Sequence, residues 1–241
     1  MRYLLLHAFP LDGSMWDEVA DILRGAGHDV SAPNLRGFGS QPLGDDSPDL
    51  DRMVDDIEHL IGDQPAIVAG CSMGGYVALG LARRRPDLVD ALALVDTKAT
   101  ADPEAARANR ERVALLAESG GDWSAGMLDN LLGATTRETR PDVVSRVERA
   151  LRSAPRATIA WAQRAMAGRA DARETLSSIE CPVLVIVGQE DTVSPMSDQA
   201  LILDAAPEAG LHVVERAGHL TPLESPAAVA AALAGLAPPM R

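Results

Sequence analysis

The chain has 241 residues, 46% of them hydrophobic and 24% charged, which is typical of a soluble globular protein with one large core. Asp and Glu (35) outnumber Lys and Arg (22), and the resulting net charge of −13 disfavours binding to nucleic acid or to an anionic membrane surface. No apolar run approaches the roughly 20 residues of a membrane span, and the first ten residues lack the features of a signal peptide. We therefore expect a cytoplasmic protein.

Short apolar runs alternate with longer helical patterns, which is typical of βαβ units and a parallel sheet covered by helices on both faces. Serines at positions 14, 194 and 225 are predicted to cap three of the helices. The six predicted strands are Tyr3–His7, Asp29–Ala32, Ala66–Gly70, Ala91–Val95, Val183–Val187 and Leu211–Val214.

The strand pattern disappears between the fourth and fifth predicted strands. Residues 97–175 are rich in Ala and Arg and show apolar stripes at helical spacing, broken into about four helices by Gly120-Gly121, Gly133 and Pro155. This stretch is too long for a plain crossover. The sequence predicts an α/β core formed by residues 1–96 and 176–241, with a helical lid inserted before the last two strands.

The stretch Gly70–Gly75, with Ser72 in it, directly follows a predicted strand and precedes an Ala- and Leu-rich helix. This is the strand–turn–helix context of a G-x-S-x-G nucleophile elbow. A sharp turn strains the serine, so positions 70 and 74 must be glycine, where side chains would collide. The helix that follows directs free N–H groups and its positive dipole end at a developing oxyanion. The motif predicts Ser72 as a nucleophile.

A nucleophilic serine needs a base, and the chain has five histidines. His219 lies in a glycine-marked loop after the last predicted strand, at the edge of the sheet where sites of parallel-sheet proteins gather. His28, His59 and His212 fall before a strand, in a helix and in a strand, and we expect them to be structural. His219 is therefore the predicted base.

The acid should follow a strand that lies between the elbow and the base in the chain. Asp191 follows the fifth predicted strand and gives the order Ser…Asp…His; Glu190 is its neighbour, and Asp96, after the fourth strand, is the rival.

Backbone N–H groups of Met73, at the elbow, and Phe9, after the first strand, are predicted to bind the oxyanion.

The chain resembles the α/β-hydrolase fold family of esterases, lactonases and cofactor-free haloperoxidases. Matching pieces occur in the family's order over almost the whole chain: His7–Pro10, Asn34–Ser40, Gly70–Gly75, Gly188–Asp191 with Pro195, and Gly218-His219 with Glu224. The resemblance implies a mostly parallel doubly wound sheet and a serine hydrolase with a Ser-His-Asp triad.

We expect the chain to cleave a small carboxylic ester or lactone through an acyl-enzyme. The mechanism requires no cofactor, and no Cys/His cluster with metal-ligand spacing appears; Cys71 and Cys181 do not predict a disulfide framework. Three alternatives stay open on the same triad: a C–C bond hydrolase, a cofactor-free perhydrolase, and a ligand receptor with little turnover. Lys98, the only lysine, would suit a hydroxynitrile lyase, but a solvated charge at the lid entry is the simpler interpretation.

The sequence gives little information about the substrate pocket. Trp123, Met127, Trp161 and Met166 are the candidates for lining it, although the same apolar stripes would equally pack the lid on the core. The lid arginines would guide an anionic substrate or form a solvated face. Oligomeric state is not indicated.

Overall fold

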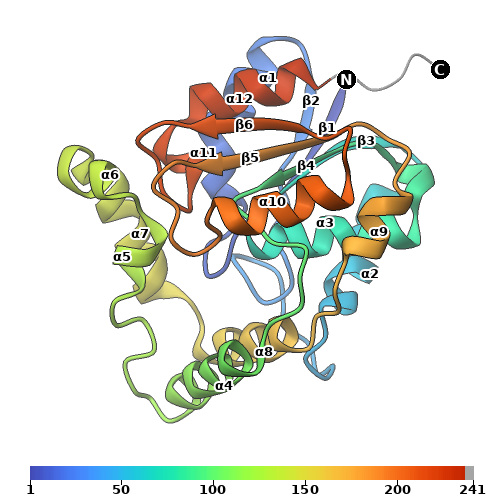
Figure 1. Ribbon diagram of the computed structural model, residues 1–241. Helices are drawn as coiled ribbons and strands as arrows, with labels where there is room; N and C mark the ends of the chain where they lie inside the picture. The colour runs from blue at the N-terminus through green and yellow to red at the C-terminus, as the bar shows by residue number, and fades with distance from the viewer. Residues whose placement is uncertain (237–241) are drawn as a thin grey trace.

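The computed structural model describes residues 1–236 and contains one six-stranded parallel sheet with helices on both faces (Figure 1). The strand order is β2-β1-β3-β4-β5-β6. The strands are β1 (Arg2–Leu6), β2 (Asp29–Ser31), β3 (Ala66–Cys71), β4 (Val89–Val95), β5 (Val183–Gly188) and β6 (Gly210–Val214). All six predicted strands are therefore present, and the α/β-hydrolase-type fold expected from the sequence is confirmed.

Two layers of helices cover the sheet, because strands that are apolar on both sides must be buried on both sides. One layer holds α1 (Asp17–Gly25) and α12 (Pro226–Gly235), which pack together, with the short helices η1 (Gly13–Trp16) and α11 (Thr221–Glu224) beside them. The other layer is formed by α2 (Leu50–Ile61), α3 (Met73–Arg84), α9 (Arg173–Ser178) and α10 (Met196–Ala205), with the short η2 (Pro86–Leu88) leading into β4.

The segment between β4 and β5 is helical, as predicted, but it holds six helices where about four were expected. We call the first five the inserted helices: α4 (Glu104–Glu118), α5 (Met127–Leu131), α6 (Ala134–Thr139), α7 (Pro141–Ser153) and α8 (Arg156–Ala167). The additional break lies at Pro141, which starts α7 at a position where its missing N–H costs nothing. The sixth helix, α9, packs on α3 and α10 of the core although it begins within the predicted insertion.

The predicted serine caps are wrong in detail. Asp12, not Ser14, caps η1 by accepting the N–H of Ser14. Ser225 makes no side-chain cap bond at α12, and the Ser194 hydroxyl donates to Asp191 instead of capping α10. No helix within residues 1–236 combines the length and the apolar character that crossing a bilayer requires.

Candidate active site

Ser72 occupies a sharp turn between β3 and α3. Its backbone has φ 51° and ψ −112°, a conformation that L-residues rarely adopt. A Cβ on Gly70 would lie 2.2 Å from the carbonyl oxygen of Gly74, and a Cβ on Gly74 would lie 2.2 Å from the carbonyl oxygen of Leu6. Gly70 is therefore required by the backbone of the turn itself and Gly74 by its close approach to β1, as the motif predicts.

Hydrogen bonds from the neighbouring strand hold this strained turn in place. The Ser72 N–H donates to the Val95 carbonyl at 2.9 Å, and the Thr97 hydroxyl donates to the Ser72 carbonyl at 2.7 Å. Such surrounding contacts are what allows a non-glycine residue to persist at a positive φ.

The side chain of His219 joins Ser72 to Asp191. His219 is buried in the loop between β6 and α11; its Nε2 lies 2.8 Å from Ser72 Oγ, and its Nδ1 lies 2.9 Å from Asp191 Oδ2. An ionised carboxylate only accepts hydrogen bonds, so Nδ1 carries the ring proton and Nε2 accepts from the serine hydroxyl. The structure thus brings together the three residues that the sequence singled out.

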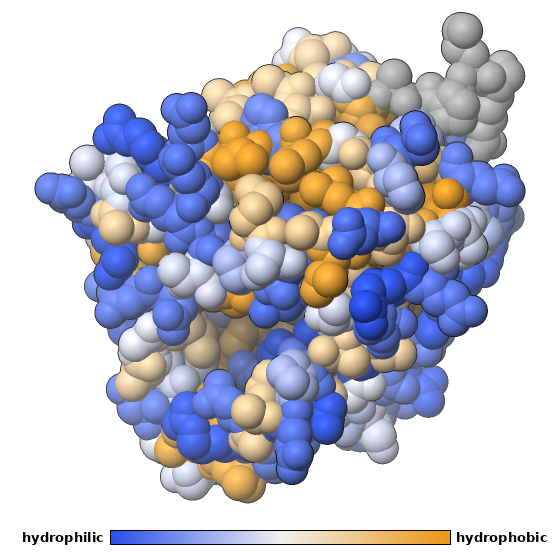
Figure 2. All heavy atoms as spheres, in the orientation of Figure 1, coloured by the Kyte–Doolittle hydropathy of each residue, from blue (hydrophilic) through white to orange (hydrophobic). Residues whose placement is uncertain are grey.

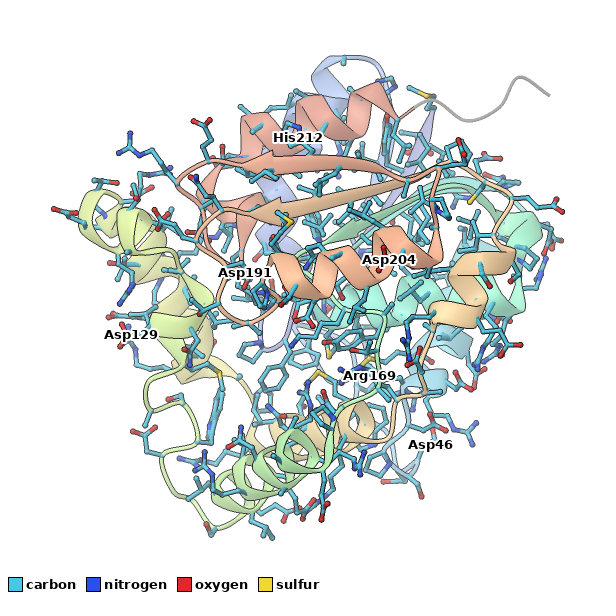
Figure 3. The ribbon with its side chains drawn as sticks, viewed as in Figure 1. Asp46, Asp129, Arg169, Asp191, Asp204 and His212 are labelled. Carbon is cyan, nitrogen blue, oxygen red and sulfur yellow. The ribbon has the colours of Figure 1, made fainter. Side chains whose placement is uncertain are left out.

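Asp191 lies in the loop between β5 and α10 (Figure 3) and is oriented by that loop. Its Oδ1 accepts the N–H groups of Val193 at 2.8 Å and Ser194 at 3.0 Å, and the Ser194 hydroxyl donates to Oδ2 at 2.6 Å. This role of Ser194 was not predicted from the sequence. Its signal is the Asp-x-x-Ser spacing, in which an aspartate accepts from the backbone two and three residues later.

The electrostatics of the pair favour an ionised Asp191. Burial by itself would raise the pKa of Asp191, but the charge of His219 and the hydrogen bonds from His219 and Ser194 outweigh burial and lower it. Burial likewise disfavours protonated His219, yet the charges of Asp191 and Asp96 raise the pKa of the imidazole above its ordinary value. The imidazole is thereby made a stronger base.

Asp96, the rival acid, is buried beside the site but does not contact the imidazole nitrogens. Its carboxylate accepts the N–H of Gly188 at 3.0 Å and, from Thr221, the N–H at 2.9 Å and the hydroxyl at 2.7 Å. Burial and the charge of Asp191 raise the pKa of Asp96 to about 7, against the opposing effects of His219 and Thr221. Asp96 therefore ties together the loops that carry Asp191 and His219.

Two further glutamates connect the inserted helices to these loops. Buried Glu224 accepts the N–H groups of Gly133 at 2.8 Å, Gly218 at 2.9 Å and Leu220 at 3.1 Å. Glu190 accepts from both the N–H and the hydroxyl of Thr135 in α6. The contacts of Glu224 with Gly133 and of Glu190 with Thr135 do not follow from sequence spacing, because they join segments far apart in the chain.

His7 lies at the end of β1 and has a structural role. Its Nε2 accepts the Leu35 N–H at 2.9 Å, and its Nδ1 lies 3.0 Å from the Ala8 carbonyl oxygen. Complete burial lowers the pKa of His7 to about 4, so the ring is neutral at pH 7. The imidazole fastens the loop after β1 to the loop after β2.

A cavity of about 260 Å³ between the inserted helices and the core opens onto Ser72 and His219. Figure 2 shows the surface hollowed between these helices, at the bottom of the view, and the core above them. Of the predicted pocket residues, Met127 and Met166 line the cavity, and so does Phe9. The Phe9 and Met73 N–H groups remain the predicted oxyanion donors; the neighbouring Ala8 N–H is directed to Met15 Sδ at 3.1 Å.

The two predicted tryptophans do not line this cavity. Trp161 donates its indole N–H to the Asp46 carbonyl at 2.8 Å, and Trp123 packs against the Phe9 ring with centroids 6.4 Å apart. Both hold the inserted helices against loops of the core. The rest of the lining was not predicted from the sequence: Tyr76, Lys98, Asp102, Ala106, Asn109, Arg110, Val113, Asn130, Leu131, Gln163 and Val193.

Part of that lining had a detectable signal. Ala106, Asn109, Arg110 and Val113 follow the i, i+3, i+4, i+7 spacing of one helix face. This spacing places the four side chains on one face of α4, which is the face that meets the cavity. Lys98 lines the cavity and pairs with Asp198 at 3.1 Å, so it is not simply a solvated charge.

The whole architecture has known counterparts. Residues 3–232 match the Alpha/beta hydrolase family. This chain belongs to that family. Both the fold and the family resemblance inferred from the sequence are thereby confirmed.

Several similar proteins carry esterase names. A pimeloyl-[acyl-carrier protein] methyl ester esterase of Neisseria meningitidis serogroup C is 32% identical over 227 residues, which cover 90% of this chain and 86% of the relative. The structure of a thermophilic esterase from Thermogutta terrifontis, solved with malate bound, is 34% identical with a TM-score of 0.91 over 97% of this chain and 88% of that one. A hydrolase from Pseudomonas aeruginosa PA01 is 28% identical with a TM-score of 0.84, over 97% and 89% of the two chains.

Proposed function

We propose that the chain is a serine hydrolase that cleaves a small carboxylic ester or lactone through Ser72, His219 and Asp191. The observation that carries the proposal is the continuous hydrogen-bonded line from Ser72 Oγ through the His219 ring to Asp191, beside a cavity of substrate size. The esterase names of the relatives agree with this reaction class. A cytoplasmic location stays a prediction from the sequence.

The reaction follows from the positions of these groups. His219 Nε2 takes the proton of Ser72, the alkoxide attacks the ester carbonyl, and the N–H groups of Met73 and Phe9 bind the oxyanion. The protonated imidazole returns its proton to the leaving alcohol, and an acyl-enzyme forms on Ser72. A water molecule deprotonated by His219 then releases the acid. Asp191 stays ionised and stabilises the imidazolium.

The experiment that tests the proposal is labelling with a fluorophosphonate probe, with the adduct located by mass spectrometry and short p-nitrophenyl esters assayed in parallel. We expect an adduct on Ser72 and turnover that is lost in Ser72→Ala. Ser194→Ala is the matched control, because Ser194 Oγ also lies 3.3 Å from the imidazole and this variant should still be labelled at Ser72.

The outcomes separate the alternatives. An adduct on Ser194, or no adduct on Ser72 in folded protein, would contradict the nucleophile assignment. Labelling without turnover of any ester would favour the receptor interpretation. Cleavage of β-diketones, or formation of peracid, in preference to ester hydrolysis would favour the C–C hydrolase or the perhydrolase.

A further inference from the structure

The cavity above Ser72 is not a plain acyl pocket, because the inserted helices contribute polar side chains to its wall. Asn109 and Arg110 come from α4, Asn130 from α5, and Gln163 from α8. A purely hydrocarbon substrate would remove water from these groups without giving them hydrogen-bond partners, which is unfavourable. The wall therefore indicates a substrate with a polar end.

Arg110 is the fixed cation of this wall. Its Nε donates to the Asp102 carboxylate, while its Nη1 donates to Gln163 Oε1 at 3.1 Å and lies 3.4 Å from Met166 Sδ. The side chain is 19% exposed, so it is held mostly inside the protein yet reaches the cavity. With Nε and Nη1 engaged, Nη2 is the donor left for a ligand.

The charges around Arg110 do not cancel. Asp102, which is 6% exposed, also pairs with Arg169 at 2.7 Å, so two guanidinium groups share one carboxylate. Arg169 lies between the inserted helices and the core, with its guanidinium 4.3 Å from the centre of the Tyr76 ring (Figure 3). Burial raises the pKa of Asp102, but the two arginines outweigh burial and lower it, so Asp102 stays ionised.

Arg110, Arg169 and Asp102 together carry an excess of one positive charge. The other cation of the wall, Lys98, adds nothing to this excess because it pairs with Asp198 at 3.1 Å. This local excess lies in a protein whose net charge is −13. A partly buried positive charge that shares its carboxylate partner with a second arginine favours an anionic ligand. A guanidinium held in place is well suited to bind a carboxylate.

We propose that the substrate carries a carboxylate besides its scissile ester, as in a half-ester of a short dicarboxylic acid, and that Arg110 binds this carboxylate through Nη2. This inference rests on the proposed function, since the same cavity must hold the ester carbonyl at Ser72. Arg110 then determines specificity by contact with substrate, and the surrounding Asp102 and Gln163 keep its guanidinium in place.

The test compares monomethyl esters of succinate, glutarate and adipate with the methyl esters of the corresponding monoamides, which have the same length and no charge. We expect wild type to prefer the acid over the amide, measured as kcat/KM, by about 10- to 100-fold for the best chain length. Arg110→Gln should lose most of this preference through a higher KM for the acid, while the kcat/KM for the uncharged amide changes much less.

The matched control is Arg152→Gln, which removes one positive charge from an arginine of α7 that is 67% exposed and pairs with Glu148. It should keep the acid preference. Arg110→Lys should keep part of the preference, because it retains the charge and loses the planar fork of donors. Free glutarate should inhibit wild type competitively and Arg110→Gln much more weakly, a readout that depends on ligand binding alone.

The proposal is overturned if wild type hydrolyses the acid and the amide equally while its ester turnover depends on Ser72, and the proposed function then stands. It is also overturned if Arg110→Gln keeps the full preference. Absence of any Ser72-dependent ester turnover would instead overturn the proposed function. If Arg110→Gln does not fold, as judged by its melting temperature, the proposal is tested with Arg110→Lys and with glutarate on wild type. A full acid preference in Arg110→Lys, together with no inhibition of wild type by glutarate, would then overturn it.

Discussion

At the scale of single residues, the reactivity of His219 depends on three charged neighbours. Burial and the charge of Lys98 lower its pKa, whereas Asp191, which accepts a hydrogen bond from its Nδ1–H, and the charge of Asp96 raise it. The balance raises the pKa of His219 above its ordinary value of 6.5. Because only the neutral imidazole can take a proton, the proposed mechanism makes activity sensitive to acid at a pH above that value.

We therefore expect kcat/KM of wild type to fall as the pH decreases through an apparent pKa above 6.5. Asp96→Asn removes the fraction of negative charge that Asp96, with a pKa of about 7, still carries in this range, so the acid limb should move to lower pH by less than about one unit. The measurement is the pH profile of kcat/KM for a neutral p-nitrophenyl ester. Asp63→Asn, which changes a fully exposed carboxylate, is the control and should leave the limb where it is; an unmoved limb in Asp96→Asn would contradict the assignment.

The other buried imidazole, His7, makes a prediction about stability. Its pKa is about 4 in the folded protein and about 6.5 unfolded, so the unfolded chain binds more protons between these values. Protonation of His7 therefore leaves the free energy of unfolding unchanged above pH 6.5 and lowers it as the pH falls toward 4. Between pH 7 and pH 5 the loss should be about 2 kcal/mol.

The measurement is urea unfolding of wild type and His7→Gln at both pH values. Glutamine can still accept from the Leu35 N–H but does not titrate in this range. Wild type should lose about 2 kcal/mol more than the variant on acidification. Parallel losses in the two proteins would show that His7 is protonated in the folded state.

At the scale of elements, the site depends on loops that are fastened to one another. Glu224, in α11, accepts from Gly218 and Leu220 on both sides of His219 and from Gly133 before α6. One carboxylate thus positions the base and anchors the inserted helices. Glu190 makes a parallel link between the Asp191 loop and α6.

Glu224→Gln should reduce both stability and turnover. A glutamine keeps one acceptor oxygen and places an NH2 group against backbone N–H donors, so buried donors lose their partners at a cost of about 1–3 kcal/mol. We expect a lower melting temperature and a kcat reduced about ten- to a hundredfold, with little change in KM, because Glu224 does not line the cavity. Exposed Glu215→Gln is the control; an unchanged kcat would remove Glu224 from any positioning role.

At the scale of the whole molecule, the inserted helices share their core with the sheet. Their buried residues Val113, Val147 and Ile159 belong to one hydrophobic cluster with the strands and the covering helices. Hydrogen bonds from Thr158 and Trp161 of α8 to the loop after β2 add to this packing. Elements that share a core are expected to unfold together.

We therefore predict a single unfolding transition. Trp16 is buried in the α/β core, whereas Trp123 and Trp161 lie in the insertion. A Trp16→Phe variant reports the insertion by fluorescence, and a Trp123→Phe/Trp161→Phe variant reports the core. In each variant the fluorescence midpoint in urea should coincide with the midpoint from far-UV circular dichroism. Separate midpoints would show that residues 97–175 form an independent domain.

The predicted strands agree with the structure to within two residues at each end. The central strands β1, β3, β4 and β5 are buried on both faces and therefore appear as continuous apolar runs. The largest difference is at β4, which begins at Val89 rather than Ala91 because the charged Asp90 interrupts the run. The extra helices of the insertion were missed since α6 and α9, of six residues each, are too short to show a helical period.

The sequence by itself determined the elbow at Ser72, the order of strands and helices, and the candidates Asp191 and His219. Each of these is encoded by local chemistry: glycines where a Cβ would clash, and polar residues directly after apolar strands. Only the tertiary structure decided that Asp191 rather than Asp96 contacts the imidazole, that Trp123 and Trp161 pack outside the cavity, and that Arg110 reaches into it. These outcomes depend on distances between segments far apart in the chain, which packing fixes and local spacing does not encode.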